Sequence, residues 1–299
     1  MKQTAKYTIA CTRAKAGPKT AKYWIDGRLV DQSEAAIPLT DLAVTRGYAA
    51  FDSLRTYGNV PFLLDAHLKR LENTCVILHL KPPLERKNIA RAVLATVAAN
   101  KFPESLIRIY VTGGDASGLI PENKERLVIL VDPLRAYPAR HYVKGIVLAT
   151  TRLNRVLPLA KSTDYLAGVW ETTRARKKGF DEVVFIDRQR NILEGTTFNV
   201  VAIIGRKLVS RTDGVLRGIT VEHVLGLARE AGLSVRRVPI SPRMLAKADE
   251  IFVTSSIREI IPVVRIDDKW IGSGFPGPVT RLLHQRYHES ALAIRSQGR

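Results

Sequence analysis

The sequence predicts an α+β protein of two domains, and three observations support this. The chain of 299 residues has the length of about two ordinary domains. Short runs typical of strands and longer stripes with helical spacing follow one another along it. Residues 133–139 contain two prolines, which interrupt both periodicities and are typical of a linker. We therefore expect a basic arm over 1–20, a small domain over 21–132 and a larger domain over 140–299.

The first domain opens with a hairpin signal, because two short apolar runs flank Asp26-Gly27 within 23–30. Asp65 is expected to cap a helix whose apolar stripe includes Leu68, Leu71 and Cys75. The other elements expected in this half are a strand over 51–57, a helix over 87–100, and strands over 106–112 and 126–131.

The second domain is expected to begin with a strand over 145–150. A helix over 164–178 is indicated by Asp164 as its cap, by basic residues in its last turns and by Gly179 after them. The remaining expected elements are strands over 182–187, 192–204 and 251–253, and helices over 220–231, from Ser241-Pro242 and from about Pro278.

Composition narrows the class of protein. Hydrophobic residues make up 45% and charged residues 25%, which is typical of globular proteins. No apolar run approaches the roughly 20 residues of a membrane-spanning helix, and the two cysteines cannot form a disulfide framework. The basic start of the chain lacks the apolar stretch of a secretory signal. These features predict a cytoplasmic protein without a membrane partner.

The net charge of +19 raises the alternative of a nucleic-acid-binding protein. Basic residues are spread along the whole chain, however, with only short clusters such as 174–178 and 236–237. No recognition-helix, zinc-finger or aromatic RNA-binding pattern accompanies them. A solvated basic surface is therefore the favoured interpretation, and a specific nucleic-acid partner is not expected.

Lys161 and Glu194 are the candidate catalytic pair. A lysine amine can form a Schiff base with an aldehyde cofactor, and the apolar segment 156–160 before Lys161 is expected to desolvate it and lower its pKa. Glu194 lies in an otherwise apolar strand, where a carboxylate could hold a cofactor ring nitrogen protonated. A surface lysine and an outward-facing edge glutamate are the plainer alternatives.

A phosphate cradle is expected downstream of this pair. Gly218, Ile219 and Thr220 precede a helix, whose first N–H groups and positive end attract anions. Ser255 and Ser256 follow a buried strand and offer a second set of donors. Each segment alone also fits an ordinary helix cap or loop.

Together these segments resemble the class IV (fold-type IV) pyridoxal-phosphate aminotransferases, from about residue 23 to residue 287. Residues 64–71, with Arg70, resemble the helix that carries the phosphate-binding arginine of that family. Lys161 matches the Schiff-base lysine, Tyr165 the tyrosine near the ring hydroxyl, and Glu194 the partner of the ring nitrogen. The resemblance places Gly218, Ile219, Thr220, Ser255 and Ser256 on the two phosphate cradles.

The resemblance implies a homodimer whose cofactor, pyridoxal 5′-phosphate, lies between a small N-terminal and a larger C-terminal domain. It implies ping-pong transfer of an amino group between an amino acid and a 2-oxo acid, such as 2-oxoglutarate or pyruvate. Lys161 would carry the proton during this transfer. A lyase on the same scaffold, like aminodeoxychorismate lyase, is the alternative reaction. The histidines show no ligand spacing, and no metal site is expected.

The substrate is less clearly indicated. Residues 46–55 depart from the Tyr-Gly-x-x-x-Phe-Glu-Gly-x-Arg segment of branched-chain members. Gly118 and Ile120 stand where D-amino-acid members carry an arginine and a histidine. Arg46, Tyr48 and Arg108 are the candidate substrate-binding residues, although the solvent face of a sheet is an equally good place for Arg108. If Arg46 and Arg108 both reach the pocket, they could bind the α-carboxylate and a second carboxylate of the substrate. This favours D-amino-acid transamination, with a branched-chain aminotransferase as the alternative.

Overall fold

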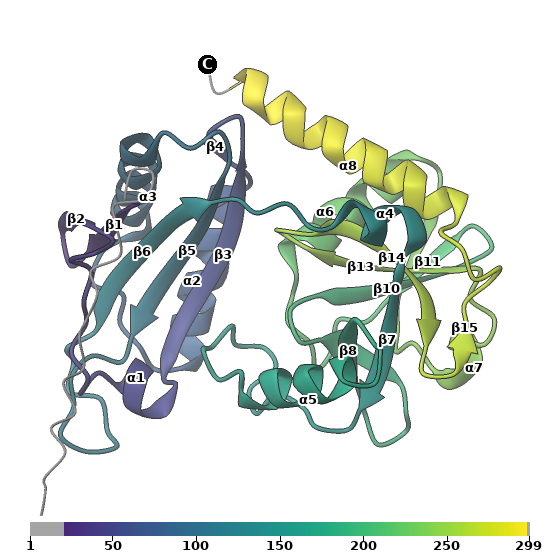
Figure 1. Cartoon of the computed structure of the whole chain (residues 1–299), viewed down its shortest axis with the longest axis horizontal. Coiled ribbons are helices and arrows are strands. Elements are labelled where there is room, and N and C mark those ends of the chain that lie inside the picture. The colour runs from purple at the N-terminus through teal and green to yellow at the C-terminus, as the bar shows by residue number, and fades with distance from the viewer. Residues whose placement is uncertain (1–20, 298–299) are drawn as a thin grey trace, which may run out of the picture.

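The computed structural model describes residues 21–297, with side chains to residue 293, as two units that each contain one sheet (Figure 1). The predicted basic arm lies outside the described residues. The N-terminal unit has an antiparallel six-stranded sheet in the order β2-β1-β6-β5-β3-β4. Its elements are β1 (Lys22–Ile25), β2 (Arg28–Asp31), α1 (Leu42–Arg46), β3 (Ala49–Tyr57), β4 (Val60–Pro61), α2 (Leu64–Ile77), α3 (Arg86–Asn100), β5 (Ser105–Thr112) and β6 (Arg126–Pro133).

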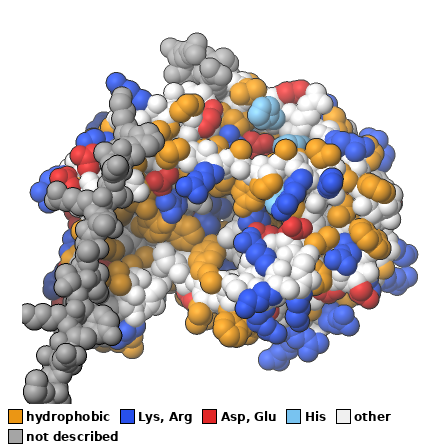
Figure 2. Space-filling view, viewed as in Figure 1, with side chains coloured by type: hydrophobic (Ala, Val, Ile, Leu, Met, Phe, Trp, Pro, Cys, Tyr) orange, Lys and Arg blue, Asp and Glu red, His pale blue; other side chains and the backbone are white. Residues whose placement is uncertain are grey.

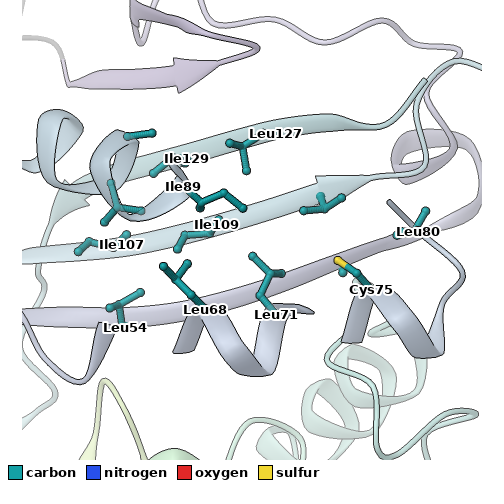
Figure 3. Close-up of a cluster of buried hydrophobic side chains, with 14 of the residues drawn as sticks. Leu54, Leu68, Leu71, Cys75, Leu80, Ile89, Ile107, Ile109, Leu127 and Ile129 are labelled. Atoms are coloured by element: carbon teal, nitrogen blue, oxygen red, sulfur yellow. The ribbon is translucent and has the colours of Figure 1, made fainter. Parts of the chain in front are cut away.

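The core of the N-terminal unit lies between its sheet and helices α2 and α3 (Figure 3). Ile107 and Ile109 alternate along β5 with half-buried residues, as the two-residue period of a strand requires. Leu68 and Leu71 of α2 are buried against this face, as their spacing predicts. Asp65 does not cap α2, because the helix begins one residue before it, after Leu63 in a left-handed conformation.

The C-terminal unit contains a nine-stranded sheet in the order β12-β11-β10-β13-β14-β7-β8-β9, with β15 paired to β14. Strand β7 runs parallel to both of its neighbours. The elements are α4 (Ala139–Lys144), β7 (Ile146–Thr151), α5 (Leu166–Arg176), β8 (Glu182–Ile186), β9 (Ile192–Gly195), β10 (Asn199–Ile204), β11 (Lys207–Ser210), α6 (Ile219–Glu230), β12 (Ser234–Arg237), α7 (Pro242–Leu245), β13 (Glu250–Ser255), β14 (Glu259–Ile266), β15 (Lys269–Trp270) and α8 (Pro278–Gln297).

Two expectations for this unit are corrected. Residues 192–204 do not form one strand, because the chain turns between β9 and β10, where the Gly195 N–H donates to the Phe198 carbonyl over 2.8 Å. Asp164 does not cap α5, which begins after Tyr165. By contrast, a short helix does start at Ser241-Pro242, as expected, and the Ser241 side chain caps it by accepting from the Met244 N–H.

Two segments cross between the units in addition to the connection near residue 134. Tyr57 and Phe62, at the end of β3 and just after β4, are buried in a core that includes side chains of α6 and α8. In the other direction, Ala160 is buried in the core of the N-terminal unit. Backbone hydrogen bonds then attach the following residues to β3, because the Phe51 N–H donates to the Lys161 carbonyl over 2.9 Å. The chain around Lys161 is thereby fixed to both units.

A search of residues 21–297 finds no helix that is both long and apolar enough to cross a membrane.

Candidate active site

A cavity of about 360 Å³ lies between the two units, and Figure 2 shows the molecule hollowed at this junction, with hydrophobic side chains around the hollow. Its walls come from β3, α2 and β5 on one side, and from β9, the start of α6 and the segment between β13 and β14 on the other. The predicted site residues that line it are Arg70, Arg108, Lys161, Tyr165, Glu194, Gly218, Ile219, Thr220, Ser255 and Ser256. The fold thus brings together residues that are up to 186 positions apart, from 70 to 256.

Lys161 is buried with 9% of its surface exposed, and its amine nitrogen lies 4.4 Å from the centroid of the Phe51 ring. Burial, reinforced by the nearby positive charge of Arg70, lowers the pKa of Lys161 to about 8. The predicted lowering is therefore seen, but its predicted source is wrong. Val156 and Leu159 of the preceding segment are 80% and 52% exposed, and the Phe51 ring lies against the amine instead.

This pKa predicts the pH dependence of the amine. A lysine is nucleophilic only when it is neutral, and its ordinary pKa of 10.5 leaves it almost fully charged at pH 8. We expect the rate at which the cofactor-free protein captures an aldehyde to rise with pH and to level off above about 8. Stopped-flow absorbance with pyridoxal measures this rate. A plateau reached only above about pH 10 would contradict the lowered pKa.

Glu194 is 4% exposed and its carboxylate has two donors. The Arg155 guanidinium donates to Oε1 over 3.2 Å, and the Leu216 N–H donates to Oε2 over 3.0 Å. Burial raises the pKa of the Glu194 carboxyl, while these two donors oppose the rise. A carboxylate oxygen can accept more than one hydrogen bond, so both oxygens retain capacity for a further donor in the cavity.

Arg70 reaches the cavity wall from α2 and is fixed by a buried carboxylate. Its Nε and Nη2 atoms donate to the two oxygens of Asp52 over 2.8 Å each. Asp52 is fully buried and also contacts His67 Nδ1 at 2.8 Å. The arginine and the histidine hold the pKa of the Asp52 carboxyl well below its ordinary value, in spite of its burial. The guanidinium is therefore held in place in a fork geometry before any ligand binds.

The start of α6 lies on the other side of the cavity from α2. Gly218 precedes the helix, and within residues 21–297 no side chain caps its first turn. Thr220 Oγ1 lies 3.5 Å from Ser256 Oγ, which in turn lies 3.5 Å from His67 Nε2. The buried Thr254 hydroxyl beside them has no hydrogen-bond partner in the described part of the chain. Free helix N–H groups, hydroxyls and Arg70 together form a donor set suited to a phosphate group.

The structure does not bring Arg46 and Tyr48 to this cavity. Arg46 ends α1 at the exposed surface, where it donates to the Thr45 carbonyl over 2.8 Å. The Tyr48 ring packs against the N-terminal core and its hydroxyl donates to the Leu78 carbonyl. Arg108 does line the cavity, where it is ion-paired with Asp132 of β6.

The sequence did not predict several residues that lie in or behind the cavity wall. Arg155 and Arg258 line the cavity, and Asp52 lies behind Arg70. Arg258 lies two residues after Ser256 of the predicted serine segment, so its position was a usable signal. Asp52 and Arg155 carried no local signal, because their partners Arg70 and Glu194 lie 18 and 39 residues away. Among the described residues, no group of histidine, cysteine, aspartate and glutamate side chains could hold a metal ion.

Comparison with known proteins identifies the family. Residues 49–266 match the model of the class IV amino-transferases, and the chain belongs to this family. It is 28% identical over 282 residues to the D-alanine aminotransferase of Bacillus licheniformis, covering 91% of this chain and 98% of that relative. It is 28% identical over 286 residues to the branched-chain-amino-acid aminotransferase of Escherichia coli K12, covering 90% and 93%.

A solved structure agrees with these relatives. A branched-chain amino acid aminotransferase from T.th., solved with pyridoxamine 5′-phosphate, superposes with a TM-score of 0.86 at 27% identity, over 91% of this chain and 94% of that one. The predicted family and the predicted two-domain α+β fold class are therefore confirmed. The protein is a transaminase of class IV, and the family implies amino acid and 2-oxo acid substrates and pyridoxal phosphate as cofactor.

Proposed function

We propose that this chain binds pyridoxal 5′-phosphate in the cavity between its units and transfers an amino group from a branched-chain amino acid to a 2-oxo acid. The observation that carries the proposal is the convergence of Lys161, Glu194 and the uncapped start of α6 on one cavity. A covalent nucleophile, a buried carboxylate and a phosphate-binding helix end are the groups that this cofactor requires.

When bound, pyridoxal phosphate supplies an aldehyde that can carry an amino group and a ring that withdraws electrons from it. Lys161 would provide the nucleophilic amine for the aldehyde. After substrate has displaced that amine, Lys161 would take the proton from the substrate α-carbon as a general base and return a proton as a general acid. A pKa of about 8 suits both roles near neutral pH. Glu194 would accept a hydrogen bond from the ring nitrogen.

Arg70, Thr220 and Ser256 would hold the phosphate, together with the N–H groups at the start of α6. Thr254, whose buried hydroxyl is unpartnered among the described residues, has a donor to spare for the same purpose. Tyr165 lines the same cavity, and its ring meets the edge of the Phe51 ring at 5.8 Å between centroids. Arg108 would bind a substrate carboxylate.

The choice of a branched-chain donor departs from the D-amino-acid preference that the sequence favoured. Relatives named for branched-chain amino acids occur in both the sequence and the structure comparisons. Phe51, Leu106 and Ile257 add apolar surface to the cavity wall, which suits an apolar side chain. D-amino-acid transamination is the second candidate, supported by the equally similar D-alanine aminotransferase of B. licheniformis.

Half-reactions test the proposal. The cofactor-loaded protein should lose its yellow absorbance with L-leucine and regain it with 2-oxoglutarate. D-alanine and D-glutamate should act far more slowly. Faster bleaching by D-alanine would select the second candidate. Pyruvate released from aminodeoxychorismate without an amino acceptor would instead identify a lyase. A protein that binds no cofactor and shows salt-dependent affinity for DNA would overturn the proposal.

We also infer a cytoplasmic homodimer. Large apolar side chains within ten residues of Lys161 along the chain are exposed, namely Val156 (80%), Leu166 (78%), Val169 (62%) and Trp170 (60%). An apolar patch of this kind is typical of a protein interface. Light scattering should give twice the chain mass of 33.2 kDa, and Trp170→Glu should shift it toward the single mass. Monomeric wild-type protein at micromolar concentration would contradict the inference.

A further inference from the structure

Glu259 closes the turn between β13 and β14 in a backbone conformation that glutamate rarely adopts. Ser255 and Glu259 are paired across this hairpin, so residues 256–258 form the turn between them. The φ angle of Glu259 is 60°, in the left-handed region, where a Cβ atom is disfavoured and glycine is the usual residue. Such a conformation persists only where the surrounding structure holds it. The contacts of the Glu259 side chain supply that support.

The Glu259 carboxylate is buried and joins three elements, since only 6% of the residue is exposed. From β3, the Arg55 guanidinium donates to Oε1 over 3.0 Å, and the Tyr57 hydroxyl donates to the same atom over 2.5 Å. From α8, His284 Nε2 lies 2.9 Å from Oε2, and His288 Nδ1 lies 3.8 Å from Oε1. We call Glu259 and these four residues the Glu259 cluster.

The cluster keeps Glu259 charged and ties the turn to both units. Burial acts to raise the pKa of the Glu259 carboxyl, but the donors from His284 and Tyr57 and the charge of Arg55 outweigh it, and the pKa lies below its ordinary value. Strand β3 belongs to the N-terminal unit, whereas β14 and α8 belong to the C-terminal unit. Moving the turn away from these partners would leave a buried charge unpaired, which is strongly unfavourable.

The other side of the same turn faces the active site. Ser256, the first residue of the turn, lines the cavity that contains Lys161. Ile257 lines that cavity and also a second one of about 650 Å³, whose wall includes Glu259. The turn is therefore a partition, with the Ser256 hydroxyl available on one side and the Glu259 cluster on the other.

We propose that Glu259 is a positioning residue for the phosphate group of the cofactor. Its carboxylate holds the last residue of the turn in the left-handed conformation, and the turn thereby presents Ser256 to the cavity beside Thr220, at 3.5 Å between their hydroxyl oxygens. This inference rests on the proposed function. Without the carboxylate, residue 259 would return to a favoured backbone region, and Ser256 would shift relative to Thr220 and Arg70.

The test compares two aldehydes that differ only by the phosphate ester, pyridoxal 5′-phosphate and pyridoxal. Absorbance titration of the full-length, cofactor-free protein gives the Kd of each. The ratio of the pyridoxal Kd to the pyridoxal phosphate Kd reports what the phosphate contributes. We expect Glu259→Ala to lower this ratio roughly tenfold, because alanine keeps the Cβ atom but loses the carboxylate that held it. The Kd of pyridoxal itself should change by less than about threefold, since Lys161 and Glu194 stay in place.

Glu259→Gly separates the backbone conformation from the carboxylate. It loses the same contacts as the alanine variant, but glycine adopts the left-handed conformation freely, so the ratio should stay within about threefold of the wild-type value. Glu250→Ala is the matched control. Glu250 is similarly buried, with 7% exposed, and its carboxylate accepts from the N–H groups of Val279 and Thr280 at the start of α8. It lies outside the turn, and its loss should leave the ratio unchanged.

His284→Phe is the milder variant, and it decides if Glu259→Ala fails to fold. The Tyr142 and His284 rings are stacked at 5.2 Å between centroids, and phenylalanine can keep this stacking. It cannot donate to the Glu259 carboxylate. We expect the ratio to fall about threefold, as for loss of one of several donors to a charged group.

A reduced ratio in Glu259→Ala, with a nearly normal ratio in Glu259→Gly, supports the inference. An unchanged ratio in the alanine variant, or in His284→Phe if the former does not fold, would overturn it. So would equal weakening of both ligands, because the cluster would then only support the fold, and so would equal losses of the ratio in the alanine and glycine variants. If the wild-type protein binds pyridoxal as tightly as pyridoxal phosphate, the proposed cofactor site itself fails, and the role of Glu259 fails with it.

Discussion

Replacing Lys161 with alanine should reduce transamination at least about 10⁴-fold, because one side chain supplies both the covalent nucleophile and the carrier of the α-proton. The yellow absorbance of the lysine-linked cofactor should disappear at the same time. Steady-state assays of leucine with 2-oxoglutarate measure the first effect, and difference spectra measure the second.

The matched control is Lys178→Ala at the exposed C-terminal side of α5, which should retain full activity and colour. Loss of a salt bridge would not explain the loss of activity in Lys161→Ala, because Lys161 has no ion-pair partner within 4.0 Å among the described residues. A colourless Lys161→Ala protein that still transaminates at a rate near that of the wild type would end the proposed mechanism.

Glu194→Gln should lower turnover by about 100- to 1,000-fold while the cofactor stays bound. The amide has nearly the shape of the carboxylate but carries no charge, so it can no longer stabilise a protonated ring nitrogen. The phosphate-binding residues and Lys161 remain in place, and the yellow colour should therefore persist. Single-turnover bleaching by leucine measures the loss directly.

The control for Glu194→Gln is Glu230→Gln at the exposed end of α6. Arg155→Lys provides a second comparison, since it keeps a positive charge near Glu194 and should cost less activity than loss of the carboxylate. If Glu194→Gln retained most of the turnover, Glu194 would be a structural partner of Arg155 and of the Leu216 N–H instead of a partner of the cofactor.

The sequence alone predicts this site well where the chemistry lies within short segments. Glu194 with Gly195, and Thr220 after Gly218, are neighbours along the chain, and the fold needs only to bring such segments together. Strands and helices were likewise placed to within a few residues wherever an apolar period extends over several turns or pleats. The broken strand at 196–198 has no such period and was missed.

The rest depends on tertiary contacts that leave no local pattern. Asp52 fixes Arg70 from a different element, and nothing near position 52 indicates that its carboxylate is buried. Segment 156–160 shows the opposite error. It is apolar, so burial was expected, yet most of its side chains are exposed while Phe51, distant in sequence, covers Lys161. Hydrophobicity indicates that a residue tends to be buried, but one sequence alone does not indicate which other residues will pack against it.

The burial of Ala160 in the N-terminal core also bears on the order of events during synthesis. The strands and helices of the first unit are complete by residue 133, but their core lacks its last side chain until residue 160 has left the ribosome. Tyr57 and Phe62 are covered later still, because their partners on α8 are translated after every strand of the two sheets. The nascent chain therefore exposes apolar surface until α8 has left the ribosome, and its demand for chaperones should fall only then.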